Sequence, residues 1–401
     1  MSGRVRPMPT IRTTRGTLTS TMVTTTTTTV TTTNGCGWCA ADSGSDAVFT
    51  FRDLYRAYGE CRRRKRASRD AQRYDMALLD HLFDTLHRLE TNAWLPTTPR
   101  CFVAKRPKVR EIHAAPFSDR VVHHWLVPRL DRLFEPVFIY DSYSNRRGKG
   151  THAAVARLQK FLRAPGSIYF LQLDIRNFFN SIHKPTLFYQ LQHRLRKALR
   201  QAKIDQPEAL ALRTLCHRLL RQDVSTAVQI GSPQAFTRLP AHRRLANAGP
   251  ERGLPIGNLT SQFFANVYLN ELDQFVKHTL GCRYYCRYVD DFILLHDDPA
   301  QLRLWREAIV GFLDQRLKLT LKPGDKLRRV SDGIDFLGYI IRRDHTLVRR
   351  RVVGNLRVRL NGYATQVLSG RRCSGGQSGA KGSVELSLQP DLRDQVRATL
   401  A

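Results

Sequence analysis

Two adjacent aspartates between two apolar, β-rich runs constrain this chain more than any other feature. The segment Tyr288–Asp291, with the sequence Tyr-Val-Asp-Asp, joins the run Cys282–Arg287 to the run Phe292–Leu295. On a regular strand, neighbouring side chains point to opposite faces, so one of the two carboxylates would enter the core at a high desolvation cost. At the bend of a hairpin, both can lie at a polar opening and bind a cation. Carboxylates placed in this way suit Mg²⁺, which takes few protein oxygens together with water and substrate phosphate.

A third aspartate ends an apolar run further upstream. Ile168–Leu173 is mostly apolar and Asp174 follows it, a pattern that predicts a buried strand with a carboxylate at its C-terminal end. An aspartate at this place also caps ordinary turns, and Asp174 alone does not separate the two interpretations. A second pair, Asp297-Asp298, stands just before Pro299 and indicates a turn.

Two glycine-containing segments accompany the aspartates. Gly253–Gln262 carries glycines that let a backbone approach a flat ligand, and it precedes the run Phe263–Val276, whose apolar residues recur at helical spacing. Ile334–Tyr339 is a short apolar strand interrupted by one glycine. The remaining periodic segments predict helices over Phe51–Trp94, Asp119–Phe134 and Arg349–Leu368, and a basic hairpin over Arg100–Ala114.

With these four motif segments in this order, the chain resembles the reverse transcriptases over about residues 50–360. The resemblance implies an α+β fold of the right-hand polymerase type, with fingers, palm and thumb and an antiparallel palm sheet packed on helices. The expected parts are fingers at 47–165, a palm at 166–345 with a long connection at 200–252, and a short or incomplete thumb at 346–401 with a Gly/Ser-rich linker at 369–382.

The resemblance also implies roles for individual residues. Asp174, Asp290 and Asp291 would be the catalytic residues that hold two Mg²⁺ ions, which Mn²⁺ can replace, and the carbonyl of Ile175 would add a ligand. The matching nucleotide-binding residues are Lys105 or Lys108, Arg110, Phe179, Ile256, Gly257, Gln262 and Tyr288. Those expected near template or primer are Arg146, Phe336, Leu337 and Gly338, and the general acid is Lys326 or Lys322. Phe179 matches an aromatic steric gate against a 2′-hydroxyl, and one of Phe178 and Phe179 is expected in the core.

A finer resemblance comes from Ile256–Gln262. Group II intron and retron enzymes usually carry Gln-Gly-x-x-x-Ser-Pro at this place, whereas here the pattern is Ile-Gly-x-x-x-Ser-Gln. That form is similar to the reverse transcriptases of diversity-generating retroelements, as is the segment Lys149–Val155. Members of that family copy a template RNA with errors at adenines, so Ile256 is the residue first expected to loosen discrimination there. Antiphage-defence reverse transcriptases carry similar variants, so a defence or retron-like function is the alternative, and a non-catalytic RNA-binding scaffold is a third.

The charge of the chain predicts a polyanionic partner. Lys and Arg number 65 against 34 Asp and Glu, a formal net charge of +31. Such an excess favours nucleic-acid binding driven by counterion release. The expected partners are a template RNA, a DNA or RNA primer and dNTPs, and, for a retroelement enzyme, a small basic accessory protein.

The N-terminal part differs in kind from the rest. Residues 1–46 are Thr-rich and have no acidic residue before Asp42, so we expect a disordered basic extension. Cys36-x-x-Cys39 has zinc-like spacing, but no second pair follows it at finger spacing. No apolar run approaches the ~18 residues of a membrane span. We therefore expect a soluble, cytoplasmic protein with reduced thiols and no membrane partner.

Overall fold

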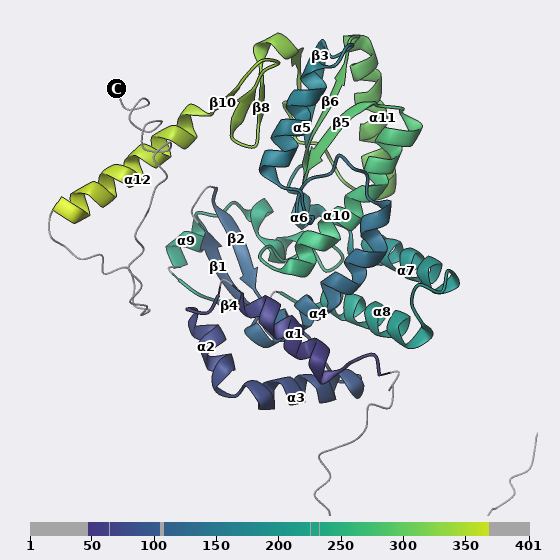
Figure 1. Cartoon of the computed structure of the whole chain (residues 1–401), viewed down its shortest axis with the longest axis vertical. Coiled ribbons are helices and arrows are strands. Elements are labelled where there is room, and N and C mark those ends of the chain that lie inside the picture. The colour runs from purple at the N-terminus through teal and green to yellow at the C-terminus, as the bar shows by residue number, and fades with distance from the viewer. Residues whose placement is uncertain (1–46, 64, 105–107, 225, 232, 369–401) are drawn as a thin grey trace, which may run out of the picture. The chain divides into compact units, whose positions relative to one another are not determined.

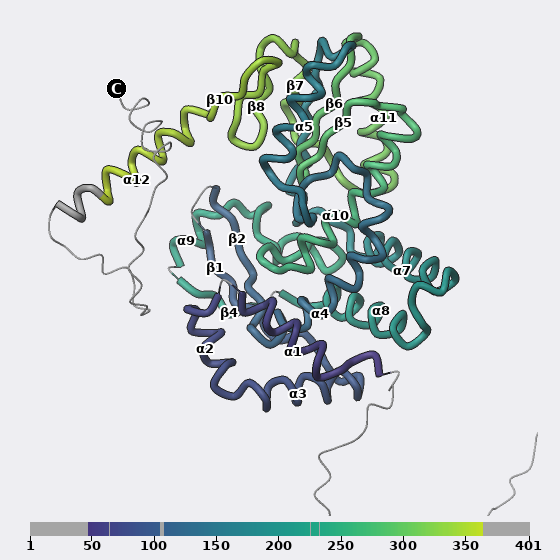
Figure 2. The backbone as a smooth tube through the Cα atoms, in the orientation of Figure 1, coloured from purple at the N-terminus to yellow at the C-terminus, as the bar shows by residue number. Residues whose placement is uncertain are grey.

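A four-stranded antiparallel sheet carries the three aspartates noted in the sequence. Its strands lie in the order β5-β6-β3-β7. They are β5 (Tyr284–Tyr288), β6 (Asp291–His296), β3 (Tyr169–Asp174) and β7 (Lys326–Arg329). The strand predicted before Asp174 and the hairpin predicted around the paired aspartates are thereby confirmed. β3 and β6, both labelled in Figure 1, are far apart in sequence and lie side by side. β7 is labelled in Figure 2, close to β5 and β6.

The computed structural model describes residues 47–63, 65–104, 108–224, 226–231 and 233–368. The helices are α1 (Phe51–Arg62), α2 (Arg69–Met76), α3 (Leu78–Glu90), α4 (Phe117–Phe134), α5 (Thr151–Arg163), α6 (Phe178–Ser181), α7 (Lys184–Arg200), α8 (Gln206–Arg221), α9 (Pro233–Thr237), α10 (Leu259–Gln274), α11 (Pro299–Leu317) and α12 (Arg350–Leu368). Short 3₁₀ turns are η1 (Glu135–Val137), η2 (Ala241–Arg243), η3 (Leu245–Ala248) and η5 (Val330–Asp332), and a π-helical turn, η4 (Phe275–Thr279), continues α10. The other strands are β1 (Arg100–Ala104), β2 (Arg110–Ala114), β4 (Val228–Gln229), β8 (Ile334–Phe336), β9 (Tyr339–Ile341) and β10 (Thr346–Val348).

Both faces of the four-stranded sheet are buried, which explains why its strands are nearly continuous apolar runs. Side chains alternate across a strand, so Leu171 and Leu173 enter one core cluster with α10 and α11. Phe170 enters a second cluster with α5 and the β8–β9 hairpin. Phe170, Gln172 and Asp174 are alternate residues of β3, so their side chains all point to this second face. The catalytic candidates therefore lie on the side of the sheet that faces β8–β9.

The N-terminal helices and a small sheet form the part predicted as fingers. The predicted helical region yields α1, α2 and α3, and the predicted basic hairpin is β1–β2, joined by β4 in a sheet of order β2-β1-β4. The predicted helix at Asp119–Phe134 is α4. His123 on α4 is buried, and burial lowers its pKa to about 3, so its neutral ring packs in the core.

The segment Ile334–Tyr339 is a strand pair, like the primer-grip strand pair of the reverse transcriptases that it was expected to resemble, and the glycine that interrupts it lies at the turn. β8 and β9 pair antiparallel, and Leu337 and Gly338 turn between them with φ of 53° and 92°. Two central residues at positive φ suit a tight hairpin whose twist matches its strands. β10 extends this sheet in the order β10-β9-β8, and α12 follows.

One part of the connection predicted at 200–252 is ordered as a helix. α8 packs against α7, with Leu212, Leu215 and Leu219 buried. Leucines at this helical spacing were the signal that the sequence interpretation did not weigh. Beyond α8, the described part of the connection contains only β4, the five-residue α9, η2 and η3.

Several predictions concern residues that the structure does not describe. The extension at 1–46, with Cys36 and Cys39, the linker at 369–382, and Lys105 lie outside the described residues. The described residues belong to one compact unit, so the boundaries among fingers, palm and thumb stay predictions. Among the described residues, no helix is both long and apolar enough to cross a membrane. The mixture of helices and antiparallel sheets confirms the α+β fold class.

Leu191 on α7 offers a test of the core. Its side chain is 0% exposed within the cluster that joins α7, α8 and α10. We expect Leu191→Ala to lower the free energy of unfolding by about 2–5 kcal/mol, because it removes apolar contacts and leaves a cavity. Tyr189, on the same helix and 62% exposed, provides the matched control, and Tyr189→Ala should change stability by at most about 0.5 kcal/mol. Equilibrium urea denaturation measures both, and equal losses would show that this packing is not as described.

Candidate active site

The sheet register brings the three aspartates together. Asp174, the last residue of β3, is the direct cross-strand partner of Asp291, the first residue of β6. Cross-strand partners share a face with Cβ atoms about 4.5–5.5 Å apart. Asp290 stands at the turn between β5 and β6, and its carbonyl accepts a hydrogen bond from the Ile175 amide at 3.3 Å. The register thus brings Asp174 to the end of the sheet where the adjacent pair Asp290 and Asp291 lies. The oxygens of the three carboxylates do not all lie within 4.8 Å of one another, so a shared cation would have to draw them together.

The turn between β5 and β6 is strained at Val289. This residue has a φ of 57°, in the left-handed region that β-branched side chains rarely adopt. A conformation of this kind costs on the order of 1–3 kcal/mol and persists only where surrounding contacts hold it. The contact that holds it is a hydrogen bond of 3.0 Å from Arg287 Nη1 to the Val289 carbonyl.

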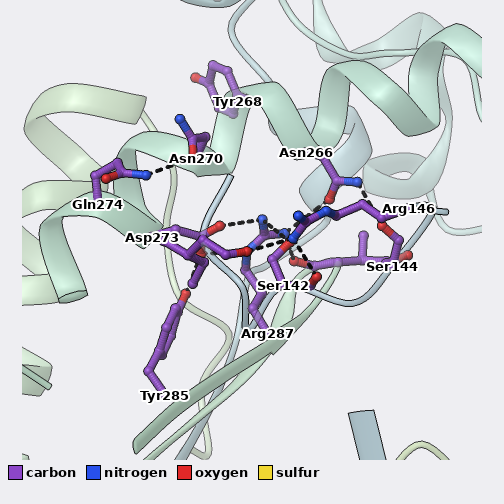
Figure 3. Close-up of polar contacts among 12 residues, drawn as sticks. Ser142, Ser144, Arg146, Asn266, Tyr268, Asn270, Asp273, Gln274, Tyr285 and Arg287 are labelled. Carbon is purple, nitrogen blue, oxygen red and sulfur yellow. Dashed lines mark hydrogen bonds and ion pairs between the residues drawn. The ribbon is translucent and has the colours of Figure 1, made fainter. Parts of the chain in front are cut away.

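Arg287 is itself fixed by a buried network below the turn (Figure 3). Its Nε and Nη2 donate to the two carboxylate oxygens of Asp273 on α10 at 2.7 and 2.6 Å. The two side chains are 1% and 0% exposed. Tyr285 donates to Asp273 at 2.8 Å, and Arg287 also donates to the hydroxyl of Ser142 at 3.2 Å. The turn that carries Asp290 and Asp291 is therefore connected to α10 by a bidentate ion pair.

Burial raises the pKa of the aspartates at the turn. The pKa of Asp290 rises from its ordinary 3.8 to about 6, because of burial and then the nearby charge of Asp174. The pKa of Asp291 rises to about 7, again first because of burial, with added repulsion from Asp174 and Asp290. Gln172 opposes this rise, since its Nε2 donates to Asp291 at 3.0 Å. The site holds more negative charge than its surroundings compensate.

Cationic side chains near the three aspartates neutralise only part of their negative charge. Lys322 Nζ lies 3.3 Å from Asp174 Oδ2. Arg110 and Lys108 lower the pKa of Asp290, and Lys326 lowers that of Asp291. These effects are smaller than the effect of burial. An all-oxygen donor set with uncompensated negative charge fits a hard cation such as Mg²⁺.

The residues expected to contact a nucleotide surround a junction between β2 and the segment before α10. The His113 amide on β2 donates to the Ile256 carbonyl at 2.8 Å. Gly257 has a φ of 123°, and a Cβ there would lie 2.9 Å from Ile112 Cγ2. Only glycine fits this backbone against β2. Gln262 lies in the first turn of α10 and is partly buried.

The two adjacent phenylalanines after Asp174 separate as expected. Phe178 is 2% exposed in the core, whereas Phe179 is only partly buried on α6. The Phe179 carbonyl accepts a hydrogen bond of 2.8 Å from the Leu254 amide. The aromatic residue proposed as the steric gate is thus attached to the Gly253–Gln262 segment. Tyr288, at the end of β5, accepts a hydrogen bond from Thr151 Oγ1 at 3.3 Å.

Two residues expected near template or primer make extensive contacts within the fold. Arg146 has a side chain 5% exposed, and its guanidinium donates to Glu135 and to the carbonyls of Ile139 and Ser142. Phe336 is 0% exposed in the cluster with α5. Their expected positions near template and primer stay predictions.

The hairpin tip beside Phe336 differs from these two residues. Leu337 and Gly338 form the β8–β9 turn and are both partly exposed. The Gly338 carbonyl accepts a hydrogen bond from the Arg349 amide at 2.9 Å, and the Arg349 guanidinium pairs with Asp335. The tip is therefore anchored at the start of α12.

Comparisons with known proteins identify the family. The model of the family "Reverse transcriptase (RNA-dependent DNA polymerase)" matches residues 103–341, which is more than half of the chain. The chain belongs to the reverse transcriptase family. Within that family it is similar to the group II intron-encoded protein LtrA of Lactococcus lactis subsp. cremoris, with 23% identity over 236 residues. The same protein from strain MG1363 matches equally. The match covers 58% of this chain and 34% of the relative, so the chain spans about a third of the length of the curated relatives it matches.

Solved structures of telomerase have a distant likeness to this chain. Apo telomerase from Candida tropicalis aligns with a TM-score of 0.44 and 11% identity, covering 63% of this chain and 49% of that one. Telomerase from Candida albicans aligns with a TM-score of 0.41 and 11% identity, covering 61% and 44%. We draw nothing further from likenesses at these scores.

The raised pKa of Asp291 gives a stability test without metal. The folded-state pKa of about 7 exceeds the ordinary 3.8, so ionisation destabilises the fold. This loss is absent below pH 3.8 and complete above pH 7. We expect Asp291→Asn, which can still accept from Gln172, to raise the free energy of unfolding by about 2 kcal/mol at pH 8 in a chelator.

Urea denaturation of both proteins at pH 8 and pH 4 measures the effect. The difference in free energy of unfolding between the two proteins should disappear at pH 4, where the wild-type carboxyl is mostly protonated. At pH 8 the same difference should become smaller when Mg²⁺ is added, because the intact carboxylate favours metal binding to the folded wild type. A variant less stable than wild type at pH 8 in chelator would contradict the electrostatics described for Asp291.

Proposed function

We propose that the chain is an RNA-directed DNA polymerase that copies an RNA template into cDNA from dNTPs. The observation that carries the proposal is the register of β3 and β6, which places Asp174 opposite Asp291 with Asp290 at the adjoining turn. Family membership supports the same activity. The proposed partners are a template RNA and a DNA or RNA primer, which the net charge of +31 favours.

In this proposal the three aspartates hold two Mg²⁺ ions, for which Mn²⁺ can substitute, with the Ile175 carbonyl as a further ligand. When bound, the ions lower the pKa of the primer hydroxyl and stabilise charge on the transferred phosphoryl group. The protein must keep the carboxylates ionised and in place. The strained turn at Val289, fixed by Arg287, supplies the placement.

Residues of β2 and α6 would bind the nucleotide. Arg110 is exposed and close enough to lower the pKa of Asp290, so its guanidinium suits a bidentate contact with the triphosphate. Lys108 acts on Asp290 in the same way, which favours it for the supporting lysine. The partly exposed ring of Phe179 would exclude a 2′-hydroxyl. Tyr288, Gly257 and Gln262 would line the same pocket.

Two lysines near the carboxylates are candidates for the role of general acid. Lys322 forms an ion pair with Asp174, and Lys326 acts electrostatically on Asp291. We propose Lys326 for protonation of the pyrophosphate leaving group, because Lys322 is already paired. The Leu337–Gly338 tip would touch the primer strand.

The first experiment is primer extension on a defined RNA template with sequencing of the product. We expect Mg²⁺-dependent cDNA, and a loss of at least about a hundredfold in Asp290→Asn with Asp291→Asn, because the double variant removes most of the metal-binding charge. The native RNA and a candidate basic accessory protein are added to both proteins if neither extends the primer. DNA synthesis that persists in the double variant would contradict the proposal.

We further propose that the enzyme is the error-prone polymerase of a diversity-generating retroelement in the cytoplasm. The pattern Ile256-Gly257 through Ser261-Gln262 supports this subtype. The Ile256 carbonyl is fixed to β2, so its side chain is carried by a backbone with a set position beside the proposed nucleotide pocket. Faithful or untemplated DNA from the purified enzyme would instead favour an antiphage-defence or retron-like role.

The side chain of Ile256 can be tested directly. We expect Ile256→Gln to reduce errors opposite template adenines by about tenfold, since a side chain that hydrogen-bonds can discriminate where an apolar one cannot. The volume-conserving Ile256→Leu should leave the error spectrum unchanged. Sequencing of cDNA from a template with all four bases measures both variants. Equal adenine error rates in wild type and Ile256→Gln would show that Ile256 does not determine discrimination at template adenines.

A further inference from the structure

A cluster of three metal-ligand side chains lies on the fingers hairpin, away from the aspartates. Cys101 on β1 and His113 on β2 are direct cross-strand partners, and Glu111 lies two residues before His113. Side chains on opposite partners and at alternate positions share one face of a sheet. All three therefore project from the same face of β1–β2. Cys101 and His113 are buried at 2% and 3% exposure.

The distances among the three side chains approach those of a coordination tetrahedron. Cys101 Sγ lies 3.6 Å from Glu111 Oε1 and 3.9 Å from His113 Nε2. His113 Nε2 lies 3.4 Å from the other carboxylate oxygen, Glu111 Oε2. Zinc bound tetrahedrally by sulfur, nitrogen and oxygen at its usual bond lengths separates these ligands by about 3.3–3.6 Å. A rotation of the Glu111 carboxylate and a small inward movement of the thiol would bring one ligand atom from each residue to these separations.

The charge of the cluster points to a cation as well. Glu111 is partly buried, and among the described residues its carboxylate makes no ion pair with Lys or Arg, although the chain carries 65 of these residues. The Leu245 amide donates to Glu111 Oε2 at 2.6 Å. This hydrogen bond orients the carboxylate toward Cys101 and His113 before any metal binds.

We propose that Cys101, Glu111 and His113 form a structural zinc site in the fingers hairpin. A thiolate, a carboxylate and a neutral imidazole together balance the charge of one Zn²⁺. The mixed sulfur, nitrogen and oxygen donors suit zinc, whereas the all-oxygen aspartates suit Mg²⁺. The fourth position is taken by water or by the second oxygen of Glu111. On binding, the Cys101 thiol releases its proton to solvent.

The position of the site gives it a structural use. The opposite face of the hairpin carries Arg110 and Ile112, and Ile112 packs against Gly257. Glu111 also holds the Leu245 amide of η3, the turn that precedes Gly253–Gln262. A metal that joins β1 to β2 would therefore fix the hairpin both against η3 and against the Gly253–Gln262 segment.

Metal binding by the full chain tests the site without reference to polymerase activity. The background is Cys36→Ser with Cys39→Ser, because that pair has zinc-like spacing of its own. We expect about one zinc per chain after dialysis, by elemental analysis, as one three-ligand site requires. The metal-free protein titrated with Co²⁺ should show thiolate-to-cobalt charge-transfer absorption, and Zn²⁺ should raise the unfolding temperature by about 3 °C or more.

Two variants decide which thiol binds. Cys101→Ala should lower the affinity for Co²⁺ at least tenfold and abolish the charge-transfer band. Cys61→Ala, which removes an equally buried thiol on α1, should leave both unchanged. Asp290→Asn with Asp291→Asn should also retain zinc, so failure of the polymerase proposal and failure of this one are distinguishable. Absence of the band in the background protein, or a band undiminished in Cys101→Ala, would overturn the site whether or not any variant folds poorly.

Discussion

The buried ion pair between Arg287 and Asp273 is the interaction on which the turn carrying Asp290 and Asp291 depends. Moving two charges into a protein interior costs several kcal/mol per ion, and their attraction offsets this only with good geometry and further hydrogen bonds. Here the pair is bidentate, and Tyr285 completes the hydrogen bonding of the carboxylate. Nη1 of Arg287 donates to the Val289 carbonyl. The contribution of this pair is therefore placement of the turn more than stability.

The turn needs support because its folded conformation carries two unfavourable contributions to the free energy. Val289 has a backbone conformation that costs energy, and Asp290 and Asp291 carry pKa values raised by burial and mutual repulsion. Without a cation, both terms favour relaxation of the hairpin. The ion pair with α10 holds the turn that carries both aspartates, so less of the hairpin would have to reorganise when a divalent cation binds. Pre-organisation of this kind moves the reorganisation cost from the binding step to folding.

The sequence predicted what local pattern determines. Asp174, Asp290 and Asp291 followed from apolar strands that end in carboxylates, and the structure brings them together in one sheet register. The helices and hairpins of the fingers followed from periodicity. The register itself was not available from pattern, because it depends on which strands pair, and pairing of β3 with β6 joins segments far apart in the chain.

The features that the sequence did not predict are contacts between side chains, which depend on which residues the fold brings together. Arg287 was part of a strand run, and only the fold shows that Asp273 faces it. Arg146 was expected at the template, and the sequence did not show that its guanidinium donates to Glu135 and backbone carbonyls, since one basic residue among 65 gives no sign of its partner. Gln172 was a polar residue in an apolar run, and its parity with Asp174 was the available signal that it faces the site.

The contacts between β2 and the Gly253–Gln262 segment would connect the proposed nucleotide selection to the rigidity of the β1–β2 hairpin. The Ile256 carbonyl and the Gly257 backbone both contact β2, so a shift of that strand moves the residues that we propose lie beside the incoming nucleotide. The same strand carries Arg110 on one face and Glu111 and His113 on the other. The proposed triphosphate contact, the proposed discrimination at Ile256 and the cluster around Cys101 consequently share one structural element. A change that loosens β2 should affect all three together, whereas a change at Ile256 alone should affect discrimination without altering triphosphate affinity.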